Sequence, residues 1–367
     1  MTSVRRPVAI MCGLAAGACL LVAPAAAQDP VDDRISKDGA VQLDGVTIPL
    51  SPLMSEEARE YMRHVIVDKP FGAALPDIRE ERKRQDGIMF DFLAPMRERY
   101  AVDVAEETIG GIVTDVVTPA GGIAPENADR VLINLHGGGF VTGGRSASLV
   151  ESVPLAALMK IKVISIDYRM APEYQFPAAS EDVEKVYREV LKHYDASRIG
   201  LFGCSAGGFL AAQSIAWFEA HDLPNPAAVG VFCASLGGYF GGDMSAIAGP
   251  LNGMLPPLVR KPGGGGPPRS SAPGYLDAAR RDDPLAYPVA SIEVMKRFPP
   301  TLFISGTRSF EMSMALDSHN KLAAGGVDSQ FHAWDSMNHA FFYNSELPES
   351  REAYAIMVDF FEKHLAD

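Results

Sequence analysis

The sequence predicts an α/β fold in which a mostly parallel sheet carries helices on both faces. Short β-branched runs alternate with helical patterns from about residue 112 to the end of the chain. Two of these runs, residues 130–137 and 162–168, are almost continuously apolar, as strands are when both faces of a parallel sheet are covered. Alternation of strands and helices on this scale is typical of a sheet enclosed between two helical layers.

The individual elements follow from local patterns in chain order. The expected strands are residues 112–118, 130–137, 162–168, 198–203, 227–235, 300–306 and 327–334. The expected helices are residues 181–194, 206–220 and 349–365. Two regions break the pattern: residues 28 to about 100 contain helical pieces without strands, and residues 236–298 are rich in Gly and Pro. The glycine run within 261–274 has neither a GxGxxG spacing nor a preceding strand, which favours a surface loop over a phosphate site.

Residues 1–27 have the three parts of a secretory signal peptide. Arg5 and Arg6 precede an apolar run over residues 8–22, and three alanines follow at residues 25–27. The run is about 15 residues long, shorter than the roughly 20 residues that a membrane-spanning helix needs. We therefore expect cleavage after Ala27 and export, to the periplasm or the medium, with no integral membrane segment left in the mature chain.

Charge and cysteine content exclude several classes of protein. Residues 1–27 contain two arginines and no acidic residue, so their removal changes the net charge from −13 to −15. A surface this acidic disfavours nucleic acids and anionic membranes as partners. Cys204 and Cys233 would remain, too few for a disulfide framework, and they could pair only if they lie close together. No CxxC or HExxH spacing occurs, so no metal site is expected.

The segment LFGCSAGGFL places Ser205 in a GxSxG motif between an apolar strand and a helix. In that context the serine sits on a tight, strained turn with its hydroxyl exposed, and it acts as a nucleophile. Gly203 and Gly207 allow the close backbone approach that the turn requires. A simple helix N-cap serine is the weaker interpretation, because the strand, the turn and the helix all match the catalytic context.

The segment INLHGGGFVTGG follows another expected strand and supplies a second glycine turn. Backbone N–H groups in such a turn can point at a substrate oxygen as it becomes negatively charged. We expect Gly137, Gly138, Gly139 and the N–H of Ala206 to form this oxyanion hole. His136 leads the turn, so we interpret it as a structural hydrogen-bonding residue.

A general base is expected late in the chain, beyond the last strand. The segment AWDSMNHAFF places His339 in a loop at that point, from which an imidazole can reach Ser205 and take its proton. The remaining histidines fit worse, because they lie in a strand, on or beside helices, or far toward the N terminus.

Together these segments resemble the hormone-sensitive lipase branch of the α/β-hydrolases, the bacterial family IV esterases. HGGGF, DYRMAPEYQFPAASED, GCSAGG and SMNHAFF fall in that family's order and spacing at residues 136–140, 167–182, 203–208 and 336–342. The resemblance covers roughly residues 85–365.

The resemblance implies a domain organisation within an α/β-hydrolase fold. The catalytic domain would consist of residues 101–235 and 299–367. An N-terminal cap segment, residues 28–100, and a cap insertion, residues 236–298, would cover the active site.

The chain departs from the family pattern at three places. Cys204 stands where the family usually has Asp or Thr, and Ala340 follows His339 where glycine is more usual. In the stretch SGTRSFEMS, Ser309 takes the position that normally holds the catalytic Asp. A serine cannot carry the negative charge that stabilises the imidazolium formed when the histidine accepts a proton.

A nearby carboxylate is the natural replacement for the missing acid, and a site without an acid is the other alternative. We expect Glu311, two residues further along the same loop, to be that acid, because its extra methylene recovers reach. Asp317, expected further along a helix, and Asp335, on the histidine loop itself, are the alternatives.

These residues predict a carboxylic ester hydrolase that works through an acyl-enzyme and needs no cofactor. The family resemblance implies short- to medium-chain acyl esters as small-molecule substrates, and the sequence leaves a homodimer open. Two other functions remain: a non-catalytic small-molecule receptor on the same fold, and a hydrolase of lactones or amides. The sequence does not distinguish ester, lactone and amide substrates, because enzymes for these substrates use the same catalytic groups and differ only in the pocket that the cap shapes.

Overall fold

An eight-stranded sheet forms the centre of the computed structural model, which describes residues 45–69, 75–253 and 274–365. The strands are β1 (Val102–Ile109), β2 (Ile112–Pro119), β3 (Val131–Leu135), β4 (Lys162–Ile166), β5 (Ile199–Cys204), β6 (Ala228–Phe232), β7 (Thr301–Gly306) and β8 (Ser329–Trp334). They lie in the order β1-β2-β4-β3-β5-β6-β7-β8. The β1–β2 and β2–β4 pairs are antiparallel and all others are parallel, which confirms the predicted mostly parallel sheet.

Strand β1 was not expected from the sequence pattern. Its sequence, VDVAEETI, carries three acidic residues and lies at an edge of the sheet, where most of its side chains are at least partly exposed. A two-residue turn at Gly110 and Gly111 joins it to β2, and both glycines have positive φ, +59° and +80°. Glycine adopts this geometry without steric cost, and it is the geometry that a tight hairpin requires.

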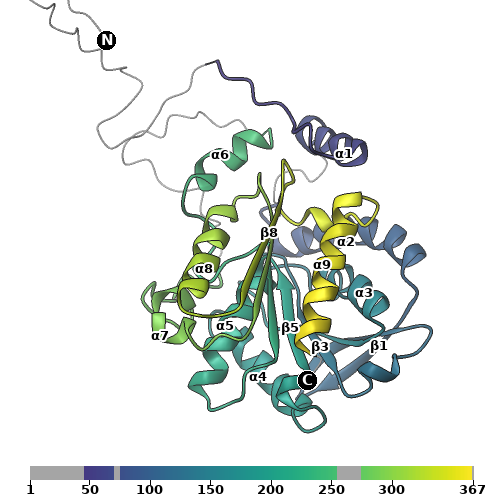
Figure 1. Ribbon diagram of the computed structural model, residues 1–367, viewed down its shortest axis with the longest axis vertical. Helices are drawn as coiled ribbons and strands as arrows, with labels where there is room; N and C mark the ends of the chain where they lie inside the picture. The colour runs from purple at the N-terminus through teal and green to yellow at the C-terminus, as the bar shows by residue number, and fades with distance from the viewer. Residues whose placement is uncertain (1–44, 70–74, 254–273, 366–367) are drawn as a thin grey trace, which may run out of the picture. The chain divides into compact units, whose positions relative to one another are not determined.

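Helices cover both faces of the sheet, as predicted. They are α1 (Glu56–Val67), α2 (Ile78–Arg99), α3 (Ala147–Met159), α4 (Ala178–Val190), α5 (Ala206–Ala220), α6 (Met244–Leu251), α7 (Ile292–Met295), α8 (Met312–Ala324) and α9 (Pro348–His364). Figure 1 shows α3 and α9 on one side of the sheet and α4, α5 and α8 on the other.

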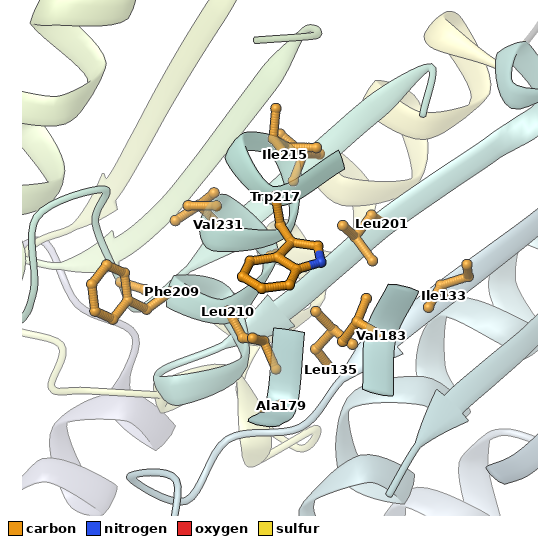
Figure 2. Close-up of a cluster of buried hydrophobic side chains, with 14 of the residues drawn as sticks. Ile133, Leu135, Ala179, Val183, Leu201, Phe209, Leu210, Ile215, Trp217 and Val231 are labelled. Carbon is orange, nitrogen blue, oxygen red and sulfur yellow. The ribbon is translucent and has the colours of Figure 1, made fainter. Parts of the chain in front are cut away.

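Each face of the sheet has its own hydrophobic core. Side chains alternate along the strands, so that Ile133 packs under α4 and α5 while its neighbour Leu132 packs toward α3 and α9. Figure 2 shows the first of these cores, where Leu210 and Ile215 of α5 lie among side chains of β3, β5 and β6, and Phe209 lies to one side. Each fully buried aliphatic or aromatic side chain of this kind contributes about 1.5–3 kcal/mol, so the sheet is held rigidly from both sides.

Helix α3 was also not expected. Its sequence, ASLVESVPLAALM, is buried on most sides and therefore lacks the polar stripe of a surface helix, and it contains Pro154. A proline inside a helix removes a backbone hydrogen bond and normally argues against a helical assignment. The helix packs against β2, β3 and β4, and this contact carries Glu151 into the interior.

Several expectations concern residues outside the described part of the chain. The signal peptide over residues 1–27 lies there, as does nearly all of the glycine- and proline-rich stretch 261–274. Among the described residues, no helix combines the length and the apolar character needed to cross a bilayer.

Candidate active site

Ser205 occupies a strained turn between β5 and α5. Its backbone has φ 56° and ψ −122°, a region that residues with a side chain rarely adopt. A β-carbon at Gly207 would lie 1.7 Å from the carbonyl oxygen of Leu135, and one at Gly203 would lie 2.1 Å from the same oxygen. Only glycine fits at these two positions. The GxSxG pattern therefore has glycines there because the turn passes directly against the backbone of β3.

The glycine turn after β3 lies beside this serine. Gly138 and Gly139 have positive φ, +115° and +64°, and a β-carbon at Gly138 would lie 2.2 Å from the carbonyl oxygen of Thr142. Within the described part of the chain, the N–H groups of Gly138, Gly139 and Ala206 have no hydrogen-bond acceptor. They are therefore available to a substrate oxygen.

The expectation for Gly137 is wrong. Its N–H donates to Oε1 of Glu151 at 2.8 Å, so it is already satisfied inside the protein. A backbone N–H that is paired with a buried carboxylate is not available to stabilise an oxyanion.

His136 is fully buried, and its ring contacts the glycine turn that it precedes. Its Nδ1–H donates to the carbonyl oxygen of Gly137 at 2.8 Å, and its ring stacks on Tyr168 with the centroids 4.1 Å apart. Burial lowers the pKa of His136 to about 4, against the opposing effect of its hydrogen bond to Gly137. A neutral ring in this position holds the turn in place.

His339 meets a carboxylate on the loop after β7. Its Nδ1 lies 2.9 Å from Oε2 of Glu311, which is fully buried immediately before α8. The hydroxyl of Ser305 donates to Oε1 of Glu311 at 2.9 Å. Ser309 lies beside both groups, with its hydroxyl donating to Oε2 of Glu311 and standing 3.3 Å from Nδ1 of His339.

The electrostatics of this site favour a charged Glu311. Burial acts to raise its pKa, but the attraction of His339 and the hydrogen bonds from His339, Ser309 and the backbone outweigh burial and lower the pKa below its usual value. The carboxylate is therefore ionised at neutral pH and can stabilise a positive charge on the imidazole.

The two alternative acids lie elsewhere. Asp317 is on α8 and forms an ion pair with Lys321 at 2.7 Å. Asp335 accepts a hydrogen bond from the hydroxyl of Thr307 at 2.9 Å. Of the three acids considered from the sequence, Glu311 is the one that the structure brings to His339.

A cavity of about 420 Å³ opens over these groups. Ser205, His339 and Gly138 lie in its wall together with Tyr343. Helices α1 and α2 supply much of the remaining lining, which includes Tyr61, Gln85, Ile88, Met89 and Phe92. The cavity is large enough for a small organic molecule, and its lining is mostly apolar.

A comparison of the whole sequence with protein families agrees with this geometry. Residues 132–343 match the family model described as alpha/beta hydrolase fold. The match spans more than half of the chain and includes the glycine turn, Ser205 and His339. The chain belongs to the alpha/beta hydrolase fold family.

Similar structures and sequences refine the placement of this hydrolase. A crystal structure of an esterase E25 has a TM-score of 0.74 and 26% identity, covering 89% of this chain and 99% of that one. An esterase from the bacterial hormone-sensitive lipase family has a TM-score of 0.70 and 26% identity, covering 85% and 100%. An acetyl-hydrolase of Streptomyces hygroscopicus is 28% identical over 269 residues, 70% of this chain and 86% of its own length.

The versiconal hemiacetal acetate esterase of Emericella nidulans is 34% identical over 123 residues, 33% of this chain, and the match spans only 40% of that relative. The solved esterase structures, one of them from the bacterial hormone-sensitive lipase family, confirm the predicted resemblance to that branch. Their names also agree with the esterase type of enzyme that the sequence predicts.

The two described cysteines of the hydrolase are free thiols, and both are buried. Burial raises the pKa of Cys204 well above its usual value and also raises that of Cys233. Among the described residues, Cys233, Glu311 and His339 are the group whose donor atoms could hold a metal ion, all within 4.8 Å of one another. The carboxylate and the imidazole of this group are already hydrogen-bonded to each other.

The sequence did not indicate several residues around the site. Phe310 stacks on the ring of His339 with the centroids 4.4 Å apart, and Ser305 holds the second oxygen of Glu311. Glu151 was also missed, although a lone acid within the apolar stretch ASLVESVPLAALM is a recognisable signal of a buried, partnered carboxylate.

Proposed function

We propose that this hydrolase cleaves carboxylic esters through an acyl-enzyme on Ser205. The observation that carries the proposal is the buried Glu311 carboxylate, 2.9 Å from Nδ1 of His339, beside a cavity that Ser205 and His339 both line. A binding protein has no need of an ionised acid that orients a histidine, so this contact favours catalysis over the receptor alternative. The decisive experiment is the removal of the Ser205 hydroxyl.

The reaction follows from the roles of these groups. The hydroxyl oxygen of Ser205 attacks the ester carbonyl while His339 takes the hydroxyl proton. The N–H groups of Gly138, Gly139 and Ala206 bind the oxygen of the tetrahedral intermediate. His339 then gives the proton to the departing alcohol. Water, deprotonated by the same imidazole, releases the carboxylic acid from Ser205, and the enzyme returns to its starting state.

The cavity limits the size of the acyl group. We propose that residues 28–100 and 236–298 act as the cap. For the first segment the support is that α1 and α2 supply much of the described lining; for the second it is the family resemblance alone, since none of its described residues lines the cavity. Buried methylenes each contribute about 0.8 kcal/mol only while the pocket has room for them. A cavity of this volume therefore favours short and medium acyl chains.

We expect hydrolysis of p-nitrophenyl esters to be most efficient for acyl chains of roughly two to eight carbons, because longer chains exceed the room in the pocket. The measurement is kcat/KM across the ester series. Phe92→Leu, which enlarges the cavity, should move the optimum to longer chains. The same substitution at the exposed Phe90, two residues away on α2, is the matched control and should not. Efficient cleavage of long-chain triglyceride emulsions by the unmodified enzyme would contradict this view of the cavity.

Lactone or amide hydrolysis remains the second candidate reaction, because it uses the same groups. A lactone keeps its leaving group tethered and an amide has a poorer one, so rates on matched ester, lactone and amide substrates separate these activities.

We also propose that the protein is exported, with residues 1–27 removed as a signal peptide, and that nucleic acids are not among its partners. The charge of −15 on the mature chain supports the second point. Protein recovered from the cell envelope or the medium of its native host should begin near Gln28, which mass spectrometry of the N-terminal peptide measures. A recovered chain that still carries Met1 would contradict the proposal.

A further inference from the structure

We propose that Glu151 is a positioning residue that fixes the oxyanion turn, the nucleophile turn and the histidine loop relative to one another. The inference rests on the proposed ester hydrolysis and adds a residue that neither touches the substrate nor belongs to the Ser-His-acid set.

Four hydrogen-bond donors converge on the Glu151 carboxylate. Oε1 accepts the N–H of Gly137 at 2.8 Å and the hydroxyl of Tyr343 at 2.5 Å. Oε2 accepts Nδ2–H of Asn134 at 2.8 Å and the N–H of Cys204 at 3.1 Å. An ionised carboxylate offers about four acceptor positions, so the four donors use all of them.

Three of the four donors stand next to groups that would carry the chemistry. Gly137 directly precedes Gly138 of the oxyanion turn, and Cys204 directly precedes Ser205. Tyr343 ends the short 3-10 helix that follows His339, four residues further along the chain. These segments come from distant parts of the sequence and meet at one side chain of α3.

The junction is tightly packed. Glu151 is 4% exposed, and a β-carbon at Gly137 would lie 3.0 Å from both the carbonyl oxygen of Cys204 and the hydroxyl of Tyr343. A shift of the carboxylate would therefore also move the segments that contain Gly137, Cys204 and Tyr343. Catalytic groups lose rate steeply when they move by about 1 Å from their productive geometry, often by 10²-fold.

A buried carboxylate is costly unless its hydrogen bonds compensate for the lost solvent. Burial raises the pKa of Glu151 to about 7, although the hydrogen bonds from Tyr343, Asn134, Gly137 and Cys204 oppose this change. A well-packed apolar side chain would fill the same space without that cost, but it would accept none of the four hydrogen bonds.

The test compares Glu151→Gln with Ser148→Ala. Glutamine keeps the shape but leaves one accepting oxygen where two stood, so at least one of the three segments loses its hydrogen bond. Ser148 lies on the same helix, one turn before Glu151, and is also buried. Among the described residues its hydroxyl has no hydrogen-bond partner, so its removal breaks no hydrogen bond of the Glu151 network. Turnover of p-nitrophenyl butyrate is measured per active site, with sites counted by covalent labelling with a fluorophosphonate, and melting temperatures are recorded in parallel.

We expect Glu151→Gln to lower kcat per active site by about 10- to 100-fold, with KM changed by less than about threefold, because orientation in the transition state is lost while the cavity is kept. Ser148→Ala should leave kcat within about twofold. Tyr343→Phe, which removes one donor, should lower kcat by about three- to tenfold, and it decides the question if Glu151→Gln does not fold.

A lower melting temperature with an unchanged kcat per labelled site would overturn the proposal, because Glu151 would then be purely structural. A wild-type enzyme that neither turns over esters nor reacts with the fluorophosphonate would overturn the proposed function, and the role of Glu151 with it. Normal wild-type turnover with unaffected Glu151→Gln turnover would overturn only the role of Glu151.

Discussion

Ser205→Ala is expected to abolish ester hydrolysis, because the change removes the oxygen atom that forms the acyl-enzyme. The expected loss in kcat is a factor on the order of 10⁴ or more. The fold should survive, since the Ser205 side chain is half-buried at the cavity and its removal opens no void in the core. Hydrolysis of p-nitrophenyl butyrate and thermal unfolding followed by circular dichroism measure the two effects separately.

Ser214→Ala is the matched control for this change. Ser214 lies on the same helix, α5, is fully buried, and donates its hydroxyl to the carbonyl oxygen of Leu210. The control should retain full activity per folded molecule. If Ser205→Ala keeps more than a few per cent of the wild-type activity, the nucleophile is another residue and the assignment fails.

The second large effect is expected at Glu311. Glu311→Gln should lower kcat by roughly 10²- to 10⁴-fold, the range for a lost acid when the nucleophile, the base and the oxyanion hole remain. The amide is neutral, so it does not stabilise the positive charge on His339. Ser309→Ala should cost no more than about five- to tenfold, because it removes one neutral hydroxyl whose hydrogen bond is worth about 1 kcal/mol. The measurement is kcat per labelled active site.

Asp317→Asn and Asp335→Asn complete this experiment. Both residues were candidates for the acid, and both make contacts away from His339. Neither substitution should change kcat by more than about twofold. The assignment of Glu311 is wrong if either change reproduces the loss while Glu311→Gln does not, or if Ser309→Ala proves more damaging than Glu311→Gln.

The sequence by itself determined the fold class and the two best-defined candidate residues of the site. Strand and helix periodicity are local properties, and so is the GxSxG turn between a strand and a helix around Ser205. His339 followed from its place after the last strand. By contrast, the local pattern did not predict β1, which carries acidic residues, or α3, which contains Pro154. Tertiary contacts stabilise both elements against their local preferences.

Only the tertiary structure decided how the remaining groups pair. Glu311, Asp317 and Asp335 were all candidates along the chain, and the choice depends on which carboxylate the loop after β7 turns toward the loop after β8. Likewise, the glycine pattern gave no reason to separate Gly137 from Gly138. The difference arises because Glu151, from a helix between β3 and β4, accepts the N–H of Gly137. Hydrogen bonds between segments that are distant in sequence depend on the order of the strands in the sheet, which no local pattern encodes.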